Sequence, residues 1–506
     1  MSDLEITTKY APPGEEVKEV EVGDSSYQEF LILSQEFQGK RLDKLTRKID
    51  WHVLPQLIFI YLLSYVDRTN VGNAKLFGAQ VDMKMTAQDW NTGLTVFFVT
   101  YAIGGPPSNM ALKRIGPKKV LPFILACVSL ILIGSGCASN RAQWFALRLL
   151  LGLFEAGMFP GCCYTLTTWY TPEQIHGRTT IYYCGASLAG AFSGLLAYAI
   201  GQADGIWGYR GWRWVYVLEG IFSFIVAMLA FFFLQETPEK QGKWLKEDER
   251  RFLVLRNKFM YGGEKGASDD TFRMKDFVTS LKSWHNYVLG FAFFSTSVAA
   301  YGLSFTLPTI VKNMGFSAAR AQGLSAPPYV FACFCVLLSG WFSDRYRMRM
   351  WSTALPSAVA FIGLLIAVLT VTHKNLVPLS YIGVCLAAGG VYCLSPSIAV
   401  WIGLNQAGQT KRAASIGLTI FIAQLGGIVG SNIYLTKEAP SYHTGFGCSL
   451  AFLGAGCIVV PMIYWYILGR INAKREAMSE EEIYARYSPE ELQEMGDLSP
   501  LYRYER

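Results

Sequence analysis

Twelve long apolar segments constrain this chain more than any other feature of its sequence. Each is close to the ~20 residues that an α-helix needs to cross the hydrocarbon core of a bilayer. Backbone groups inside that core must be hydrogen-bonded within the segment, so each segment is predicted to be a helix. The predicted spans are roughly residues 53–74, 91–111, 119–138, 142–166, 178–201, 212–234, 285–311, 324–343, 352–372, 377–400, 413–436 and 445–469.

The composition supports a membrane protein and excludes several other classes. Hydrophobic residues make up 52% of the 506 residues and charged residues only 16%, whereas soluble domains average about 25% charged residues. The net charge of +7 is small for this length, and its positive charges lie in loops between apolar segments. We therefore expect the protein to lie in a lipid bilayer and not to bind nucleic acid.

The distribution of basic residues predicts the orientation of the chain. Lys and Arg cluster before the first span, in the long break at 235–284 and in alternate loops, while the loops at 75–90 and 437–444 carry few. Basic loops stay on the cytoplasmic side. Both termini and the central loop are therefore predicted to be cytoplasmic, in a multi-pass protein of the plasma membrane.

The long central break divides the spans into two groups of six. The expected organisation is a cytoplasmic N-terminal tail, two six-helix bundles joined by a cytoplasmic loop, and a cytoplasmic C-terminal tail. In that order, the five segments comprise residues 1–50, 51–236, 237–284, 285–470 and 471–506. Residues 1–40 are polar and acidic, so we expect them to be disordered.

A short motif recurs at matching places in the two halves. The loop after the eighth span reads Gly340-Trp-Phe-Ser-Asp344-Arg345, and the loop after the second contains Arg114 and Gly116 within Asn-Met-Ala-Leu-Lys-Arg-Ile-Gly. Both resemble the Gly-x-x-x-Asp-Arg-x-Gly signature of the major facilitator superfamily. A turn with an acid and a base is predicted to act there as a gate on the cytoplasmic side. Lys113 stands where the signature has its acid.

Four charged residues lie inside the apolar segments of the first half. Asp67 and Arg68 are adjacent in the first span, and Arg148 and Glu155 are two helical turns apart in the fourth. Charges within a membrane face a cavity or one another and mark ion or substrate paths. We expect Asp67 and Arg68 to be the partners of Arg148 and Glu155, either as a structural lattice or as part of a proton-coupled site.

The physical chemistry of a buried acid beside a base suggests a coupling role. An anionic substrate that occupies the Arg would leave the carboxylate without its partner, and the carboxylate would then bind a proton more readily. Candidate side chains around such a site are Tyr65, Tyr101, Tyr301 and Gln424. Glu219 is a third acid within a span, for which we expect a structural pairing with Arg213 or a neighbour.

Signals for an enzyme are weak. The sequence has no His-Glu-x-x-His motif, no phosphate-binding Gly loop and no Gly-x-Ser-x-Gly nucleophile elbow. No catalytic residues, cofactor or metal are therefore expected, and the protein is predicted not to be an enzyme.

Several motifs together resemble the fungal anion:cation symporters, the allantoate permease-like family of the major facilitator superfamily. The resemblance covers roughly residues 45–475. The motifs are Tyr65-Val-Asp-Arg-Thr-Asn70, Gly211-Trp-Arg-Trp214, Glu236-Thr-Pro-Glu239, Tyr301-Gly-Leu-Ser-Phe-Thr-Leu-Pro308, Ser325-Ala-Pro-Pro-Tyr329, Lys411-Arg-Ala-Ala414 and Gly426-Gly-Ile-Val-Gly430.

The resemblance implies a major facilitator fold with twelve transmembrane helices in two bundles, and a proton-coupled carrier of small organic anions. It implies a proton-coupling role for Asp67 and Glu155, an anion-binding or coupling role for Arg68 and Arg148, and substrate contacts for Tyr65, Tyr101 and Gln424. The position of Gln424 is usually Asn, so this chain differs there by one methylene.

The expected function is uptake of a small carboxylate, such as a vitamin-like acid of the nicotinate kind, together with protons by a monomer. Two alternatives keep the same fold. One is export of an acidic secondary metabolite, and the other is a non-transporting nutrient sensor. The short central loop disfavours the sensor, and counterflow in vesicles with an inward proton gradient would separate uptake from export.

Overall fold

A computed structural model of the chain describes residues 25–240, 244–260, 274–346, 348–407, 409–488, 491–492 and 495–506. The chain divides into two compact units. One comprises Met1–Lys48 with Pro238–Phe272, and the other comprises Ile49–Thr237 with Arg273–Arg506. In the described part of the chain the regular elements are helices. The all-α architecture predicted from the sequence is confirmed.

Long helices occupy the positions of the twelve predicted spans. By length and composition, eleven helical segments of the described chain could cross a membrane. The second predicted span lies in α5, which is not among those eleven. The long helices are α3 (Lys40–Leu76), α5 (Ala87–Ile115), α6 (Pro117–Cys137), α7 (Arg141–Glu155), α8 (Met158–Trp169), α9 (Pro172–Ile200), α10 (Gly211–Phe233), α14 (Trp284–Asn313), α16 (Ala326–Tyr346), α17 (Arg349–Thr370), α18 (Val377–Leu404), α19 (Gln409–Ile433), α20 (His443–Phe452) and α21 (Val460–Glu476).

Two predicted spans are interrupted. The fourth consists of α7 and α8, which are separated by Ala156 and Gly157 directly after Glu155. The twelfth contains a π-helical segment at Leu453–Val459 between α20 and α21. A short helix, α15 (Ala318–Gly323), precedes the eighth predicted span. A break inside the hydrocarbon region is tolerated where protein surrounds it, and Gly157 is packed so tightly that a Cβ atom would lie 2.6 Å from Ser108.

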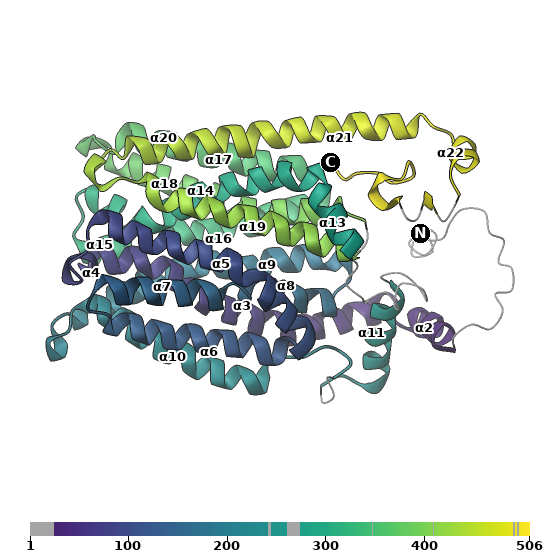
Figure 1. Cartoon of the computed structure of the whole chain (residues 1–506), viewed down its shortest axis with the longest axis horizontal. Coiled ribbons are helices and arrows are strands. Elements are labelled where there is room, and N and C mark those ends of the chain that lie inside the picture. Colours follow the sequence, from purple (N-terminus) through teal and green to yellow (C-terminus); the bar gives the residue numbers. More distant parts are fainter. Residues whose placement is uncertain are drawn as a thin grey trace. The chain divides into compact units, whose positions relative to one another are not determined.

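In the larger unit, helices from the same half of the sequence lie together. In Figure 1 the purple-to-blue helices of the first half lie on one side and the green-to-yellow helices of the second half on the other. Within the halves, α6 packs on α10 and α5 on α7, while α17 packs on α18 and α14 on α19. Between the halves, α9 packs on α16 and α5 on α19.

Small residues of the fifth span allow its close approach to the second half. A Cβ atom at Gly190 would lie 2.6 Å from the ring of Tyr329, and one at Gly194 would lie 2.8 Å from the carbonyl oxygen of Gln322. Such close backbone contact is what small residues permit between membrane helices. The fifth span therefore packs closely against α16 together with α15.

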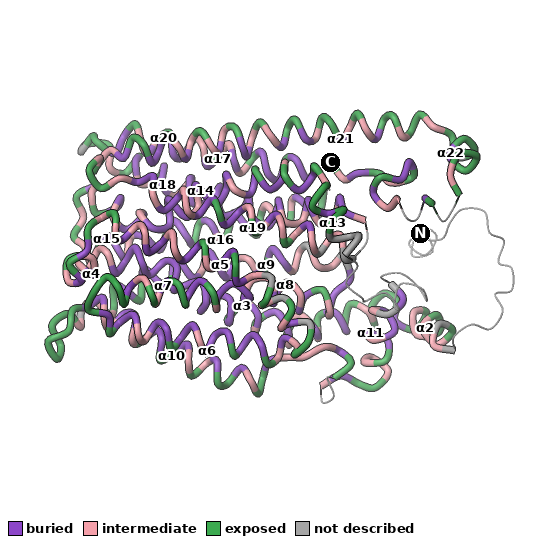
Figure 2. The backbone as a smooth tube through the Cα atoms, in the orientation of Figure 1, coloured by how far each residue is buried: buried purple, intermediate pink, exposed green. Residues whose placement is uncertain are grey.

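Apolar side chains cover much of the outside of the larger unit. Figure 2 shows the exposed positions on the outer surfaces of the outer helices, with the buried positions toward the interior. On α10 the exposed large apolar side chains recur at helical spacing and form one face: Leu218, Ile221, Phe222, Ile225, Leu229, Phe232 and Phe233. An apolar surface of this extent indicates contact with lipid.

The smaller unit corrects one expectation. Residues 25–36, which we expected to be disordered, form α2 (Ser25–Glu36), and the central loop forms α11 (Glu247–Met260). The two helices pack together within this unit, where the ring of Phe37 stacks on that of Phe252 at 4.6 Å. The polar sequence alone did not reveal α2 because its apolar partner lies more than two hundred residues away in the chain.

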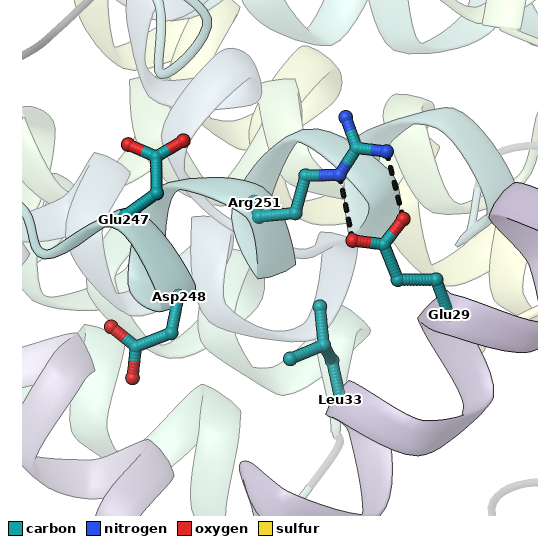
Figure 3. A pocket seen from close by; sticks show the side chains of 5 residues that line it. All are labelled: Glu29, Leu33, Glu247, Asp248 and Arg251. Atoms are coloured by element: carbon teal, nitrogen blue, oxygen red, sulfur yellow. Dashed lines mark hydrogen bonds and ion pairs between the residues drawn. The ribbon is translucent and has the colours of Figure 1, made fainter.

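An ion pair also joins α2 to α11. Arg251 donates two hydrogen bonds to the Glu29 carboxylate at 2.8 and 2.7 Å beside Leu33, at the edge of a shallow pocket that Glu247 and Asp248 also line (Figure 3). These hydrogen bonds lower the pKa of Glu29 below its ordinary value. Because both side chains are largely exposed, the pair adds little stability.

The C-terminal residues 495–506 are fixed to the second half through two asparagines. Asn472 donates a hydrogen bond to the carbonyl oxygen of Tyr504 at 2.9 Å and accepts one from its N–H at 3.0 Å. Asn405 makes the same paired contact with Glu505, at 3.0 and 2.8 Å. Because Asn405 directly follows α18 and Asn472 lies in the last turns of α21, the tail ties the ends of these two helices together.

We predict that Asn472→Ala destabilises the protein by about 1–3 kcal/mol, because it leaves the buried backbone groups of Tyr504 without partners. The measurement is the apparent melting temperature of the purified protein in detergent. Glu505→Ala is the matched control, since Glu505 contacts Asn405 through its backbone alone. Equal melting temperatures for Asn472→Ala and the wild type would show that the hydrogen bonds between Asn472 and Tyr504 contribute nothing to stability.

Candidate functional site

The four charged residues predicted from the first and fourth spans lie inside the helix bundle. Asp67 and Arg68 are on α3, and Arg148 and Glu155 are on α7. Their exposed fractions are 1%, 6%, 2% and 1% respectively. Charges this deeply buried are stable only when partners compensate them. Their contacts therefore determine what the site can do.

Arg68 has an acidic partner from the fourth span. Its Nε lies 2.5 Å from Oε1 of Glu155, and the pair is shielded from solvent. This is the ion pair expected between the two spans. Glu155 is the last residue of α7, so the pair sits where the fourth span is interrupted.

Arg68 also links the two halves of the chain. Its Nη1 donates a hydrogen bond to the hydroxyl of Tyr301 on α14 at 2.7 Å. The same hydroxyl donates to Oε1 of Gln424 on α19 at 3.4 Å. Arg68, Tyr301 and Gln424, all predicted at the site, thus form one chain of contacts from the first half to the second. A change in the position of Arg68 would therefore alter contacts in both halves.

Aromatic rings surround the Arg68 guanidinium. Its central carbon lies 4.7 Å from the ring centroid of Tyr101 and 5.3 Å from that of Tyr65, both of which were predicted at the site. The ring of Phe97 lies at 5.5 Å. Rings with negative faces stabilise a cation in a site that excludes water. These rings stabilise the Arg68 guanidinium, but they supply no anion in addition to Glu155.

Arg148 has different partners from those expected. Its Nη2 donates a hydrogen bond to the hydroxyl of Tyr216 at 2.9 Å, and its guanidinium stacks 4.1 Å from the ring of Trp144. Its Nε and both carboxylate oxygens of Asp67 are buried without a hydrogen-bond partner among the described residues. Asp67 nevertheless lies within electrostatic range of Arg148 and Arg68. The expected direct bond between Asp67 and an arginine is absent from the described contacts.

The third acid pairs with a neighbour other than Arg213. Glu219 accepts a hydrogen bond from the amide of Asn70, one helical turn after Asp67. Arg213, which was one of the two expected alternatives, donates to the carbonyl oxygen of Gly136 at 2.9 Å. Residues 213 and 219 are six apart, which places them on different faces of a helix. Glu219 therefore belongs with the buried charges, as a neighbour of Asp67.

The predicted gating residues lie away from this site. Gly116 has a positive φ of 95° and links α5 directly to α6, which is the tight turn that the motif requires. Gly340 packs against Thr180 of α9, where a Cβ atom would lie 2.3 Å from the threonine side chain. Arg114 and Arg345 are exposed. The side chain of Asp344 lies outside the described residues, so the acid–base latch stays a prediction.

Sequence reasoning missed several residues that complete the site. Each lies one helical turn from a predicted residue: Phe97 precedes Tyr101 by four positions, and Trp144 precedes Arg148 by four. Tyr216 lies one turn before Glu219, and Asn70 one turn after Asp67. Residues three or four apart share a helix face, so extending each predicted face by one turn would have found them.

The arrangement is suited to binding an anion and protons. A buried arginine in an aromatic cage offers a cation to a carboxylate, and acids without hydrogen-bond partners can accept protons. Among the residues that the structure describes, no group of three or more His, Cys, Asp or Glu side chains is placed to hold a metal ion.

The sequence matches known membrane carriers along most of its length. The pattern of the Major Facilitator Superfamily matches residues 57–431. The MFS-type transporter cnsO of Penicillium expansum is 39% identical over 488 residues, which is 95% of this chain and 94% of that protein. The high-affinity nicotinic acid transporter of Saccharomyces cerevisiae is 28% identical over 436 residues, which is 86% of this chain and 79% of that protein.

A solved structure has a similar fold. The proton:xylose symporter XylE, bound to 6-bromo-6-deoxy-D-glucose, superposes with a TM-score of 0.62 at 13% identity, over 82% of this chain and 95% of that one. At this identity the likeness concerns the fold alone. It agrees with the predicted arrangement of membrane helices in two bundles.

We predict that Arg68→Met lowers stability strongly, by about 3–5 kcal/mol, because it leaves Glu155 as a buried charge without a partner. Replacing both residues in Arg68→Met/Glu155→Gln should recover part of that loss. The apparent melting temperatures of the two single variants, the double variant and the wild type form a double-mutant cycle. Additive losses would mean that the two side chains do not interact.

Proposed function

This chain belongs to the major facilitator superfamily and is a membrane transporter rather than an enzyme, and from that premise we propose that it imports a small organic anion together with protons. The proposed substrate is a carboxylate of vitamin-like size, such as nicotinate. The proposed route is alternating access, in which the two bundles rock around a central site. Within the superfamily, the motifs quoted above favour the allantoate permease-like anion:cation symporters.

One observation carries the proposal, namely the contacts of Arg68. This arginine binds Glu155 in its own bundle and Tyr301 in the other. A carboxylate that enters the site would compete with Glu155 for the guanidinium, since both are anions with the same geometry. The Glu155 carboxylate would then lose its partner in a low-dielectric site and take up a proton. Binding of the anion and binding of the proton would thus favour each other.

The same contacts connect binding to the movement of the bundles. Tyr301 on α14 bonds to Arg68 and is in contact with Gln424 on α19. A substrate that draws Arg68 toward itself would change this bridge between the halves. A ligand shifts a conformational equilibrium only through contacts that differ between the two states, and the Arg68–Tyr301 bond is such a contact.

The choice of substrate rests on chemistry and on one relative. Arg68 and Arg148 supply positive charge, and Tyr65, Tyr101 and Tyr301 supply aromatic surface for a flat acid. A relative with 28% identity carries nicotinic acid by name. Gln424 reaches the Tyr301 hydroxyl and would set the distance to the polar end of the substrate.

The orientation and location are also proposals. The basic loops favour cytoplasmic termini and a cytoplasmic central loop, and uptake of a nutrient acid suits the plasma membrane. The gating turns around Gly116 and Gly340 would then lie on the cytoplasmic side, with Arg114, Asp344 and Arg345. We propose a monomer as the working unit, since one bundle pair contains the whole site.

We predict that Arg68→Ala lowers uptake of radiolabelled nicotinate by about tenfold or more, because truncating one member of a buried charge pair costs about 2–5 kcal/mol. Uptake is measured in cells lacking their own nicotinate carrier, at an acidic and a neutral pH, with the amount of protein at the membrane as reference. Arg213→Gln is the matched control, since Arg213 lies on α10 and bonds to Gly136 away from the site. Wild-type uptake in Arg68→Ala would refute an anion site at this residue.

We also predict that Asp67→Asn and Glu155→Gln each lose the stimulation of uptake by acid while still binding substrate. An amide keeps the shape of the side chain but cannot exchange a proton. The measurements are uptake driven by an imposed proton gradient and equilibrium binding to the purified protein. If both variants retain full acid-driven uptake, proton coupling does not involve these residues.

A further inference from the structure

A lysine without an acidic partner lies at the end of a helix that is buried on all sides. Every residue of α3 at positions 61–74 is buried, so this part of the helix has no side that faces lipid. Residues 75–78 are only half-buried. Lys75, the second-last residue of α3, therefore lies where the helix emerges from between its neighbours into water. No described acid acts on its side chain.

Lys75 lies on the same side of α3 as Arg68. The two residues are seven positions apart, which is two helical turns and about 10.5 Å along the axis. Arg68 contacts Tyr301 of the second bundle, and Gly72, one turn farther along α3, packs against Phe305, one turn farther along α14. The two helices therefore run side by side in a constant register. One turn beyond Gly72, Lys75 faces the same gap between the bundles.

The contact at Gly72 separates Lys75 from Arg68. A Cβ atom at Gly72 would lie 2.9 Å from the carbonyl oxygen of Phe305, so the two backbones leave no space for a ligand between them. Arg68 is buried on one side of this contact, and Lys75 is accessible to water on the other. Lys75 thus lies outside a closed site, on the line that leads to its arginine.

A second pair of helices closes the bundles toward the same end. Phe98 of α5 contacts Tyr301, and a Cβ atom at Gly427 of α19 would lie 2.4 Å from its ring. One turn nearer the start of α5, the Thr95 hydroxyl accepts a hydrogen bond from the Asn432 amide at 2.9 Å. These contacts must open before an anion can pass from this end of the molecule to Arg68.

The acids in the loops at this end of the bundles already have partners, so they do not compete for Lys75. Each accepts a hydrogen bond from a neighbouring backbone or side-chain group. The acids and their donors are Asp82 with the Trp212 indole, Asp89 with the Thr86 N–H, Asp204 with the Gly211 N–H, and Glu438 with the Thr444 N–H.

We propose that Lys75 forms an outer anion site, where a carboxylate from outside the cell binds before it reaches Arg68. This rests on the proposed anion uptake and orientation, and adds to them a residue outside the predicted site. Lysine suits a transient site because its ammonium is a compact, strongly hydrated charge on a flexible stem. A positive charge at a narrow entrance raises the local concentration of an anionic substrate. The anion moves on to Arg68 when the contact at Gly72 opens.

The first test uses the intact wild-type protein in cells. A membrane-impermeant, amine-reactive reagent is added outside, and the modified lysines are identified by mass spectrometry. We expect nicotinate to slow the modification of Lys75, and its neutral analogue nicotinamide to have no such effect. Lys84 is the internal control, because it is exposed in the loop before α5 and its modification should not change. Equal modification of Lys75 with and without nicotinate, or no modification from outside, overturns the proposal.

The second test measures uptake of radiolabelled nicotinate by Lys75→Gln. We expect KM to rise about fivefold, the loss of one hydrogen bond to a charged group near water. The maximal rate per transporter should stay unchanged, because Arg68 is intact. Lys75→Arg should keep the wild-type KM. Lys84→Gln is the matched control, since it removes the same charge at the same end of the bundles.

Salt distinguishes an anion site from a structural role. Charges near water are screened over about 10 Å at 0.1 M salt, so the wild-type KM should rise with ionic strength and the KM of Lys75→Gln should rise less. A structural role predicts a lower melting temperature and a lower maximal rate, with the salt dependence retained. A wild-type KM in Lys75→Gln also contradicts the outer site.

The outcomes separate this inference from the proposed function. If nicotinate protects Lys75 in a protein that does not take nicotinate up, the outer anion site stands and the proposed transport falls. If the wild type takes up nicotinate and Lys75→Gln does so with the same KM and salt dependence, the outer site falls and the proposed transport stands.

Discussion

The ion pair between Arg68 and Glu155 is the interaction on which the inner structure of this transporter depends. A guanidinium buried to this extent requires an anion within bonding distance, and Glu155 supplies it at 2.5 Å. The pair fixes α3 against the end of α7, where the fourth span is interrupted. Removing either charge would leave the other in a low-dielectric interior. The aromatic cage and the Tyr301 hydroxyl can be arranged around Arg68 only while that charge is held.

The contact between the two bundles combines one polar bridge with close packing. Arg68 reaches Tyr301 across the interface, and the small residues of α9 let its backbone approach α16. Close packing resists small deformations, whereas a single hydrogen-bonded bridge can form or break as a unit. A site with this construction suits a protein that changes between discrete states, because any change at the Arg68 guanidinium alters a contact that both bundles share.

Much of this could be predicted from the sequence because its signals are local. Apolar length indicated the spans, and charges within those spans indicated Asp67, Arg68, Arg148 and Glu155 as inward-facing residues. The partners of individual residues were less predictable. Glu219 contacts Asn70 and not Arg213, and Arg148 contacts Tyr216 and Trp144. Helix α2 was missed because the rings that stabilise it come from α11, far along the chain.

The sequence by itself determined that the chain crosses a membrane many times, that the spans divide into two sets of six, and that charges lie within the first set. These features follow from the cost of exposing polar groups to lipid, which acts on each segment separately. Only the tertiary structure decided which charges are paired and which neutral side chains the others contact. That assignment depends on the distances between helices and on how each helix is rotated about its axis. A rotation by the angle between two successive residues exchanges one neighbour for another.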